Sequence, residues 1–239
     1  MELLPKEEAR LTIHYKHHVQ RMLYRNISKE LSKFLHDYGF QVGKRRFKLF
    51  TFSDLIGKFR ILRDTKEIKF MGSVYLYISS PLQRFVNELG TTILKRGYVY
   101  IDKTQFMVRG MEILKQPEIK NEHKIKTLSP ITVYSTLYTP DGGRKTYYYS
   151  PYEREFSTLA SSNAIKKFFA LKREKIDGYI ELKPVRVEEK ILKYKGTIIK
   201  GWKGAFIIRG SPKLIEIVYQ AGIGSKNSQG FGMFEVVNR

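Results

Sequence analysis

Cysteine is absent from the 239 residues of this chain, and acidic side chains are scarce. Without thiols the chain can form no disulfide bond and no thiolate metal site. Asp and Glu number 23 against 44 Lys and Arg, so the formal net charge is +21. An excess of this size attracts polyanions, which makes nucleic acid the leading candidate for a partner.

Long apolar runs are also missing. No stretch approaches the roughly 20 apolar residues of a membrane-spanning helix, and the first residues lack the apolar segment of a signal peptide. We therefore expect no membrane partner and a cytoplasmic location. The hydrophobic content of 42% is nevertheless enough to fill one or two cores.

The two halves of the chain repeat one order of elements. Periodicity and capping residues in the first half predict a strand at 9–15, helices at 17–26 and 28–37, strands at 44–53 and 74–78, a helix from Ser80 to Gly97 and a strand at 98–114. The second half predicts a strand at 131–135, a hairpin turn at 141–143, a helix at 153–172, strands within 179–209 turning at 195–196, and a helix from Ser211 to Gly222.

Two βαββαβ units in tandem predict an α+β fold of two ferredoxin-like domains, residues 1–118 and 123–239, joined near 116–126. One larger α+β domain is the alternative.

Four glycines gather near the C-terminus, around a short polar segment, and the residues expected to contact RNA here are Gly222, Gly224, Ser225, Lys226, Asn227, Gly230 and Gly232. Glycines at this density let another molecule approach the backbone amides closely, and such a loop suits a phosphate backbone. A plain turn between helix and strand is the alternative. The spacing is no dinucleotide fingerprint, because Asn227 stands at the third glycine position.

A basic and aromatic segment runs from Lys44 to Ser53. Its first residues, Lys44, Arg45 and Arg46, are expected to contact phosphates. Its phenylalanines could stack on bases, or they could simply fill a core, as aromatic residues of strands usually do. They are Phe47, Phe50 and Phe52.

The C-terminal run from Ala221 to Phe234 resembles the glycine-rich motif of the CRISPR-associated endoribonucleases that cut precursor CRISPR RNA at its repeats, members of the RAMP superfamily. Three N-terminal segments are similar to the same family: Arg21-Met-Leu-Tyr24-Arg-Asn-Ile, Phe34-Leu-His36-Asp and Phe47-Lys48-Leu-Phe-Thr-Phe-Ser53. The resemblance covers the first 55 residues and the last 20, and it implies a duplicated ferredoxin-like fold.

The resemblance also implies that Tyr24, His36 and Lys48 are the catalytic residues of a metal-independent cut. In this reaction a ribose 2′-hydroxyl attacks the adjacent phosphate, leaving a 2′,3′-cyclic phosphate and a 5′-hydroxyl. The chemistry needs a base, an acid and a cation. Histidine can act as the acid near neutral pH, whereas tyrosine is a poor base unless its pKa is shifted, so Tyr24 could simply orient the attacking hydroxyl.

Helix geometry sets a condition on this assignment. On one unbroken helix Tyr24 and His36 would lie about 18 Å apart, too far to share one phosphate. Asn26 and Ser28 are N-cap residue types in the middle of the apolar stripe, so we expect the helix to break there. The alternatives are structural: Tyr24 in the core, His36 at a helix end and Lys48 as a further phosphate contact.

Four of the five histidines lie in the first 36 residues without an obviously spaced acidic partner, so we expect no metal and no cofactor. The expected partner is CRISPR repeat RNA, with other CRISPR effector subunits as further candidates, and the protein is expected to be a monomer or homodimer. A non-catalytic RNA-holding subunit of the same superfamily is the second hypothesis. A DNA-binding or ribosome-associated basic protein is the third.

Overall fold

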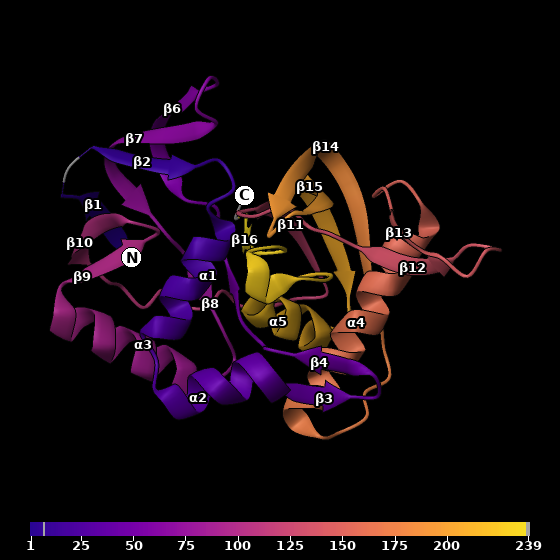
Figure 1. Ribbon diagram of the computed structural model, residues 1–239. Coiled ribbons are helices and arrows are strands. Elements are labelled where there is room, and N and C mark those ends of the chain that lie inside the picture. The colour runs from indigo at the N-terminus through magenta and orange to yellow at the C-terminus, as the bar shows by residue number, and fades with distance from the viewer. Residues whose placement is uncertain (7, 238–239) are drawn as a thin grey trace.

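A computed structural model describes residues 1–6 and 8–237 of the chain (Figure 1). Its N-terminal strands are β1 (Glu2–Pro5), β2 (Ala9–Thr12), β3 (Phe40–Val42), β4 (Arg45–Phe47), β5 (Thr51–Phe52), β6 (Ile56–Leu62), β7 (Glu67–Tyr75), β8 (Ile78–Ser79), β9 (Tyr98–Ile101) and β10 (Thr104–Gly110). The later strands are β11 (Glu122–Thr127), β12 (Tyr134–Tyr138), β13 (Arg144–Tyr148), β14 (Ile180–Tyr194), β15 (Thr197–Gly210) and β16 (Phe234–Val236). The α-helices are α1 (Lys16–Arg25), α2 (Lys29–Lys33), α3 (Gln83–Arg96), α4 (Arg154–Lys172) and α5 (Pro212–Ala221), with a π-helix η1 (Phe34–Tyr38) and a 3-10 helix η2 (Asn227–Gln229).

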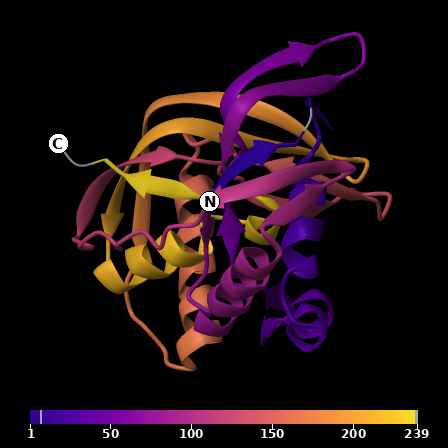
Figure 2. The same ribbon diagram turned by 90° about the vertical axis from the view of Figure 1, so that its left-hand side faces the viewer.

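Each half of the chain builds its own antiparallel sheet. The N-terminal sheet has the order β2-β7-β1-β10-β9, with β6 also paired to β7, and the C-terminal sheet has the order β14-β15-β11-β16. Counted along the chain, the second order places the first strand between the third and the fourth, as in a ferredoxin-like unit. The helices of both halves lie on one side of the sheets (Figures 1 and 2). The predicted pair of ferredoxin-like domains is confirmed.

Most of the predicted helices form where the capping residues indicated. The predicted helix at 17–26 is α1, the helix at 153–172 is α4, and the hairpin turn at 195–196 joins β14 to β15. The turn at 141–143 joins β12 to β13. The helices and turns that we predicted from local sequence are therefore confirmed in both halves.

The first strand of each sheet is misplaced in the sequence prediction. The strand at the centre of the N-terminal sheet is β1, and the predicted segment 9–15 supplies the additional strand β2. In the second half the first strand is β11, while the predicted strand at 131–135 contributes an isolated bridge between Ile131 and Trp202 before β12 begins. β1 has only four residues, and β11 buries only Ile125 and Thr127, so the apolar pattern of each is weak.

The predicted strand at 44–53 is also interrupted. Leu49 adopts a φ of 53°, which an extended strand cannot contain, so β4 and β5 are separate strands.

We propose that the two domains meet in the extended segment between Gly110 and Glu122. Of the predicted ranges 1–118 and 123–239, the second omits Glu122 of β11, and residues 238–239 lie outside the described part of the chain.

Two apolar cores, one for each half, are joined by a smaller cluster between them. In this cluster Phe47 and Leu49 of the N-terminal half pack against Ala170 of α4 and Ala221 of α5. Figure 1 shows the β3–β4 hairpin lying beside these helices of the other half. The hairpin that carries the basic segment therefore bridges the two halves.

A buried polar network also joins the halves. Lys16 of α1 donates to Asp54 at 2.5 Å and to the carbonyl oxygen of Gly230 at 2.7 Å, while Lys203 of β15 donates to the same carboxylate at 2.6 Å. Burial by itself would raise the pKa of Asp54, but the ammonium groups of Lys16 and Lys203 hold it below its ordinary value. Removing one partner would leave an uncompensated buried charge, so the network fixes how the halves fit together.

Within residues 1–6 and 8–237, no helix is both long and apolar enough to cross a membrane.

Candidate active site

The break between α1 and α2 occurs where the sequence predicts it. Asn26 ends α1, and its side chain donates to the Met22 carbonyl at 2.8 Å while accepting from Arg96 at 3.0 Å. Ser28 then caps α2, with its hydroxyl accepting from the Leu31 amide at 3.3 Å. The chain therefore changes direction between Tyr24 and His36.

A π-turn then sets the position of His36. The Gly39 amide donates to the Phe34 carbonyl at 2.7 Å, an i to i+5 hydrogen bond that widens the last turn into η1. Leu35 is fully buried and anchors this turn, whereas the His36 side chain is 72% exposed. Short π-helical turns of this kind are frequent at functional sites, because they re-aim a side chain away from the regular helix face.

Tyr24 and His36 meet across the break. Their ring centroids lie 5.9 Å apart with an interplanar angle of 80°, an edge-to-face contact. Tyr24 also packs edge-to-face on Phe50, at 5.7 Å, so its ring is held against the N-terminal core. The predicted break is confirmed, and it brings the two residues into contact.

Lys48 joins this pair through the backbone. Its ammonium donates to the His36 carbonyl at 2.6 Å, and the guanidinium of Arg46 donates to the Asp37 carbonyl at 2.9 Å. Carbonyl groups at the end of a helix have no partner within the helix, so both cations stabilise the end of η1. The structure therefore brings all three predicted catalytic residues together.

The electrostatics of the site favour different roles for its members. Burial raises the pKa of the Tyr24 hydroxyl, and the neighbouring Tyr194 adds to the rise, so Tyr24 stays protonated at neutral pH and can donate a hydrogen bond. Burial also lowers the pKa of the Lys48 ammonium, and Arg46 lowers it further, although Asp37 partly offsets the two effects. Lys48 uses one of its three N–H groups on His36, which leaves two for a phosphate.

Asp37 is a member of the site that sequence reasoning did not single out. Its carboxylate lies 2.7 Å from Nδ1 of His36, and this hydrogen bond lowers the pKa of the Asp37 carboxyl. A carboxylate on Nδ1 orients the ring and directs Nε2 outward. The only signal in the sequence was the adjacency of the two residues.

The glycine-rich loop is packed closely against other groups of the protein. The amides of Gly222, Gly230 and Gly232 all donate to carbonyl groups of the protein. A Cβ at Gly230 would lie 2.4 Å from the Phe52 ring, and one at Gly224 would lie 2.5 Å from the Thr132 carbonyl. These three amides are therefore occupied, and the glycines are required by the close approach of neighbouring groups.

The polar residues of the loop divide into a buried and an exposed set. Asn227 is buried, and its side-chain amide donates to the carbonyls of Ile223 and Phe231 at 2.9 and 3.0 Å. Ser225 and Lys226 are partly exposed, and the Lys226 ammonium lies 5.0 Å from the centroid of the Tyr134 ring. Of the predicted loop contacts, these two side chains are the ones that reach the surface.

Lys167 is a second residue that the sequence analysis did not identify. It lies on α4 with 2% exposure, and its amino group donates to the carbonyls of Gly222 and Gly224 at 2.6 and 3.0 Å. A lysine on the apolar face of a predicted helix was the available signal, because such a residue needs buried acceptors. Lys167 therefore holds the start of the glycine-rich loop against α4.

The basic segment from Lys44 to Ser53 also contains both exposed and buried residues. Lys44, Arg45 and Arg46 are exposed at the β3–β4 hairpin, where a phosphate backbone could reach them. The exposed fractions of the phenylalanines are 8%, 0% and 0% for Phe47, Phe50 and Phe52, so the interpretation of these rings as stacking surfaces is wrong. Phe50 and Phe52 belong to the N-terminal core, and Phe47 belongs to the smaller cluster between the two halves.

Two of the N-terminal histidines contact each other. His17 and His18 have ring centroids 3.7 Å apart, and His18 Nδ1 lies 3.2 Å from a carboxylate oxygen of Asp102. In the part of the chain that the structure describes, no group of three or more histidine, aspartate and glutamate side chains is arranged to hold a metal ion.

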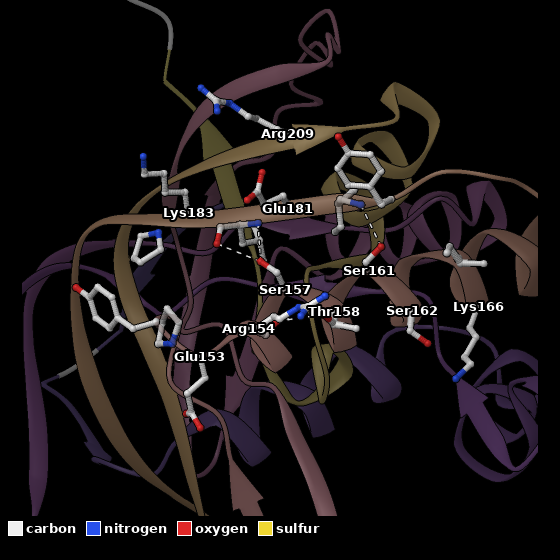
Figure 3. A pocket seen from close by; sticks show the side chains of 17 residues that line it. Glu153, Arg154, Ser157, Thr158, Ser161, Ser162, Lys166, Glu181, Lys183 and Arg209 are labelled. Carbon is white, nitrogen blue, oxygen red and sulfur yellow. Dashed lines mark hydrogen bonds between the residues drawn. The ribbon is translucent and has the colours of Figure 1, made fainter.

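An open groove of about 1170 Å³ lies elsewhere, between α4 and the edge strand β14 (Figure 3). Its floor is occupied by structural hydrogen bonds: the hydroxyl groups of Ser161 and Ser157 accept from the amides of Ile180 and Leu182 at 3.1 and 2.8 Å. These serines satisfy amides that an edge strand would otherwise expose. The groove contains none of the predicted site residues.

Comparisons with known proteins identify the family of the chain. A family model described as "CRISPR-associated protein Cas6, N-terminal" matches residues 10–112, and one described as "CRISPR associated protein Cas6, C-terminal" matches residues 114–236. The chain belongs to the Cas6 family. Membership of Cas6 places this chain among the endoribonucleases.

Among curated Cas6 proteins, the chain is 35% identical over 208 residues to "CRISPR-associated endoribonuclease Cas6 1" of Methanocaldococcus jannaschii, covering 87% of this chain and 78% of the relative. It is 25% identical over 246 residues to "CRISPR-associated endoribonuclease Cas6" of Pyrococcus furiosus, covering 99% and 88%. A solved structure described as "CRISPR associated protein Cas6" superposes with a TM-score of 0.81 at 28% identity, covering 99% of this chain and 97% of the other. Another, described as "An RAMP protein binding different RNA substrates", has a TM-score of 0.84 at 24% identity, covers 99% and 98%, and supports the fold.

Proposed function

We propose that this Cas6 protein binds CRISPR repeat RNA and cuts precursor CRISPR RNA within the repeat by attack of a ribose 2′-hydroxyl on the adjacent phosphate. The observation that carries the proposal is the convergence of Tyr24, His36 and Lys48 at the end of the π-helix. A phenol, an imidazole and an ammonium at one exposed point supply the three kinds of group that this reaction needs.

Each residue then has a distinct role. The 2′-oxygen bonds to phosphorus while the bond to the 5′-oxygen breaks, and the proton of the attacking hydroxyl passes to solvent. Protonated His36, oriented by Asp37, donates its Nε2 proton to the departing 5′-oxygen. Lys48 stabilises the additional negative charge on the phosphorane, and Tyr24, which keeps its proton, orients the attacking hydroxyl by a hydrogen bond. The products are a 2′,3′-cyclic phosphate and a 5′-hydroxyl, and no step requires a metal ion.

RNA binding in this proposal is largely electrostatic. Lys44, Arg45 and Arg46 contact phosphates from the β3–β4 hairpin, and Ser225 and Lys226 do so from the loop. The glycines and Asn227 shape the loop that presents these two side chains. Each phosphate neutralised on a single strand contributes about 0.7 to the slope of log affinity against log salt.

The deciding experiment incubates the protein with radiolabelled repeat RNA in EDTA and identifies the ends of the products. Cleavage with cyclic phosphate ends is expected, and a single 2′-deoxy nucleotide upstream of the cut should block it. His36→Ala should cut about 100- to 10,000-fold more slowly, the usual contribution of a general acid, while still binding the RNA. His123→Ala, in the other domain on β11, is the matched control and should cut normally.

Three other results would overturn parts of the proposal. Cleavage by His36→Ala at the wild-type rate would remove His36 from the mechanism. Tight binding of repeat RNA without any cleavage would indicate a non-catalytic RNA-holding subunit. Preference for duplex DNA would indicate a basic DNA-binding protein.

A further inference from the structure

The β12–β13 hairpin presents a ribbon of aromatic and basic residues that the proposed active site does not use. Residues directly opposite in an antiparallel pair share one face of the ribbon, and alternate residues share it along each strand. One face is therefore formed by three cross-strand pairs: Tyr134 with Tyr148, Thr136 with Thr146, and Tyr138 with Arg144. We call these six residues the tyrosine face.

Cations already lie over the aromatic rings of this face. The Lys226 ammonium is 5.0 Å from the centroid of Tyr134, and the Arg144 guanidinium is 5.6 Å from the centroid of Tyr138. Within the described part of the chain, neither Lys226 nor Arg144 forms a salt bridge. Both charges therefore remain available to an anionic partner.

The outer part of the tyrosine face has no structural task. Tyr148 is structural, because its hydroxyl donates to the Ile198 carbonyl at 3.1 Å and its ring packs near Tyr194 and Phe231. Tyr138, by contrast, is 71% exposed, and the structure records no hydrogen bond of its hydroxyl to another described residue. Tyr138 and Arg144 therefore place an exposed aromatic ring beside a cation, the combination by which proteins hold single-stranded nucleic acid.

The tyrosine face is continuous with the glycine-rich loop and with α1. The Ser225 amide of the loop donates to the Thr132 carbonyl just before β12, at 2.8 Å. On the other side of the loop, Gln20 of α1 donates to the Ser228 carbonyl at 2.7 Å and accepts from the Tyr194 hydroxyl. Figure 1 shows the loop between α1 and the hairpin. An RNA strand held beside Tyr24 can therefore continue across the loop onto the tyrosine face.

We propose that the tyrosine face is a stacking platform for unpaired bases of the bound RNA, with Tyr138 as its outer stacking ring and Arg144 and Lys226 as phosphate contacts. The proposal rests on the proposed function, since it extends the RNA path from the active site. Aromatic rings interleaved with cations are the features by which proteins hold single strands with little dependence on sequence, because every base has a π-face.

The spacing favours a single strand over a duplex. Tyr134 and Tyr138 are four residues apart on one strand, about 14 Å at roughly 3.4 Å per residue, whereas bases stacked in a helix lie about 3.4 Å apart. Rings at this separation engage bases of nucleotides that are not neighbours, which requires the bases to be splayed out as in an unpaired segment. Threonine between the rings leaves room for the intervening nucleotides.

The test measures affinity for repeat RNA that carries a 2′-deoxy nucleotide at the cut site, so that cleavage does not interfere. Tyr138→Ala should weaken binding about 5- to 150-fold, the usual effect of losing one stacked base, and Tyr138→Phe should keep most of the affinity because the ring remains. Tyr179→Ala is the matched control: Tyr179 is 62% exposed, beside the groove of Figure 3, and its loss should not change binding.

Abasic substitutions locate the contact. At one unpaired nucleotide, removal of the base should weaken binding to the wild-type protein but not to Tyr138→Ala, which is the coupling expected of a stacked pair. Equal affinities of the wild type and Tyr138→Ala for every RNA would overturn the platform and leave the proposed function intact. If the wild type and Tyr138→Ala bind RNA equally well but the variant no longer binds another protein subunit, the tyrosine face is a site for a protein partner.

Failure of the proposed function gives a different result. If only cleavage fails, the affinity test with repeat RNA is unchanged. If the wild-type protein binds no repeat RNA, oligouridine of the same length becomes the probe. A weaker affinity of Tyr138→Ala for oligouridine would still support a single-strand platform, and an unchanged affinity would overturn it.

Discussion

The ammonium of Lys48 donates to the carbonyl oxygen of His36 at 2.6 Å, so the expected phosphate-binding cation also stabilises the turn that carries the expected proton donor. The two residues come from different elements, a loop after β4 and the π-helix η1. Because one contact links the acid and the cation, a change at Lys48 should affect both the charge on the phosphorane and the placement of the imidazole.

Replacing Lys48 with Met should therefore lower the rate of cleavage by about 100- to 1,000-fold, similar to the loss of one transition-state donor. The rate should be measured in a single turnover at saturating protein, so that weaker RNA binding does not contribute. Lys48→Arg should recover part of the rate because charge and donor return. Lys95→Met on α3 is a control for the loss of one surface charge. A normal single-turnover rate in Lys48→Met would restrict Lys48 to a structural role.

Gly230→Ala should destabilise the fold rather than act on RNA alone. The added Cβ would lie 2.4 Å from the Phe52 ring, and Gly230 has a φ of +84°. Overpacking of this kind costs about 1 to 3 kcal/mol, in addition to roughly 1 kcal/mol for a left-handed alanine.

Gly43→Ala separates these two effects, because Gly43 also has a positive φ, +57°, but nothing lies within 4 Å of its Cβ position. Denaturant unfolding should show a clearly larger loss for Gly230→Ala. Equal losses in the two variants would mean that the contact with Phe52 relaxes easily and that close packing does not require glycine at position 230.

The stability of the protein should depend on pH through Lys167. Burial, with a smaller effect of Arg45, lowers the pKa of this lysine from 10.5 to about 7. Between these values the unfolded chain binds more protons than the folded one, so protonation favours unfolding and the free energy of unfolding rises with pH from about 7 to about 10.

Urea unfolding at pH 7, 8 and 9 checks this expectation. The slope for the wild type should exceed that for Lys167→Met by on the order of 1 kcal/mol per pH unit. Lys166→Met, one residue earlier on α4 and only partly buried, should keep the wild-type slope. Parallel curves for the wild type and Lys167→Met would show that the buried amine keeps an ordinary pKa.

The sequence by itself determined what depends on neighbouring residues. Asn26 and Ser28 end one helix and begin the next through hydrogen bonds within four residues, so the break between Tyr24 and His36 could be predicted from capping preferences. The repeated order of helices and strands indicated the duplicated fold for the same reason. Net charge, a sum over residues, indicated the class of partner.

Tertiary structure decided whatever depends on groups distant in the chain. The Gly232 amide donates to the Pro130 carbonyl, and Gly230 lies against Phe52, so the sequence of the loop alone could not show that its amides are occupied. Phe47 of the basic segment is buried because Ala170 and Ala221 of the other half pack against it. Lys167 finds its acceptors 55 and 57 residues away. A local pattern states which groups a chain carries, but packing determines which of them remain free to bind.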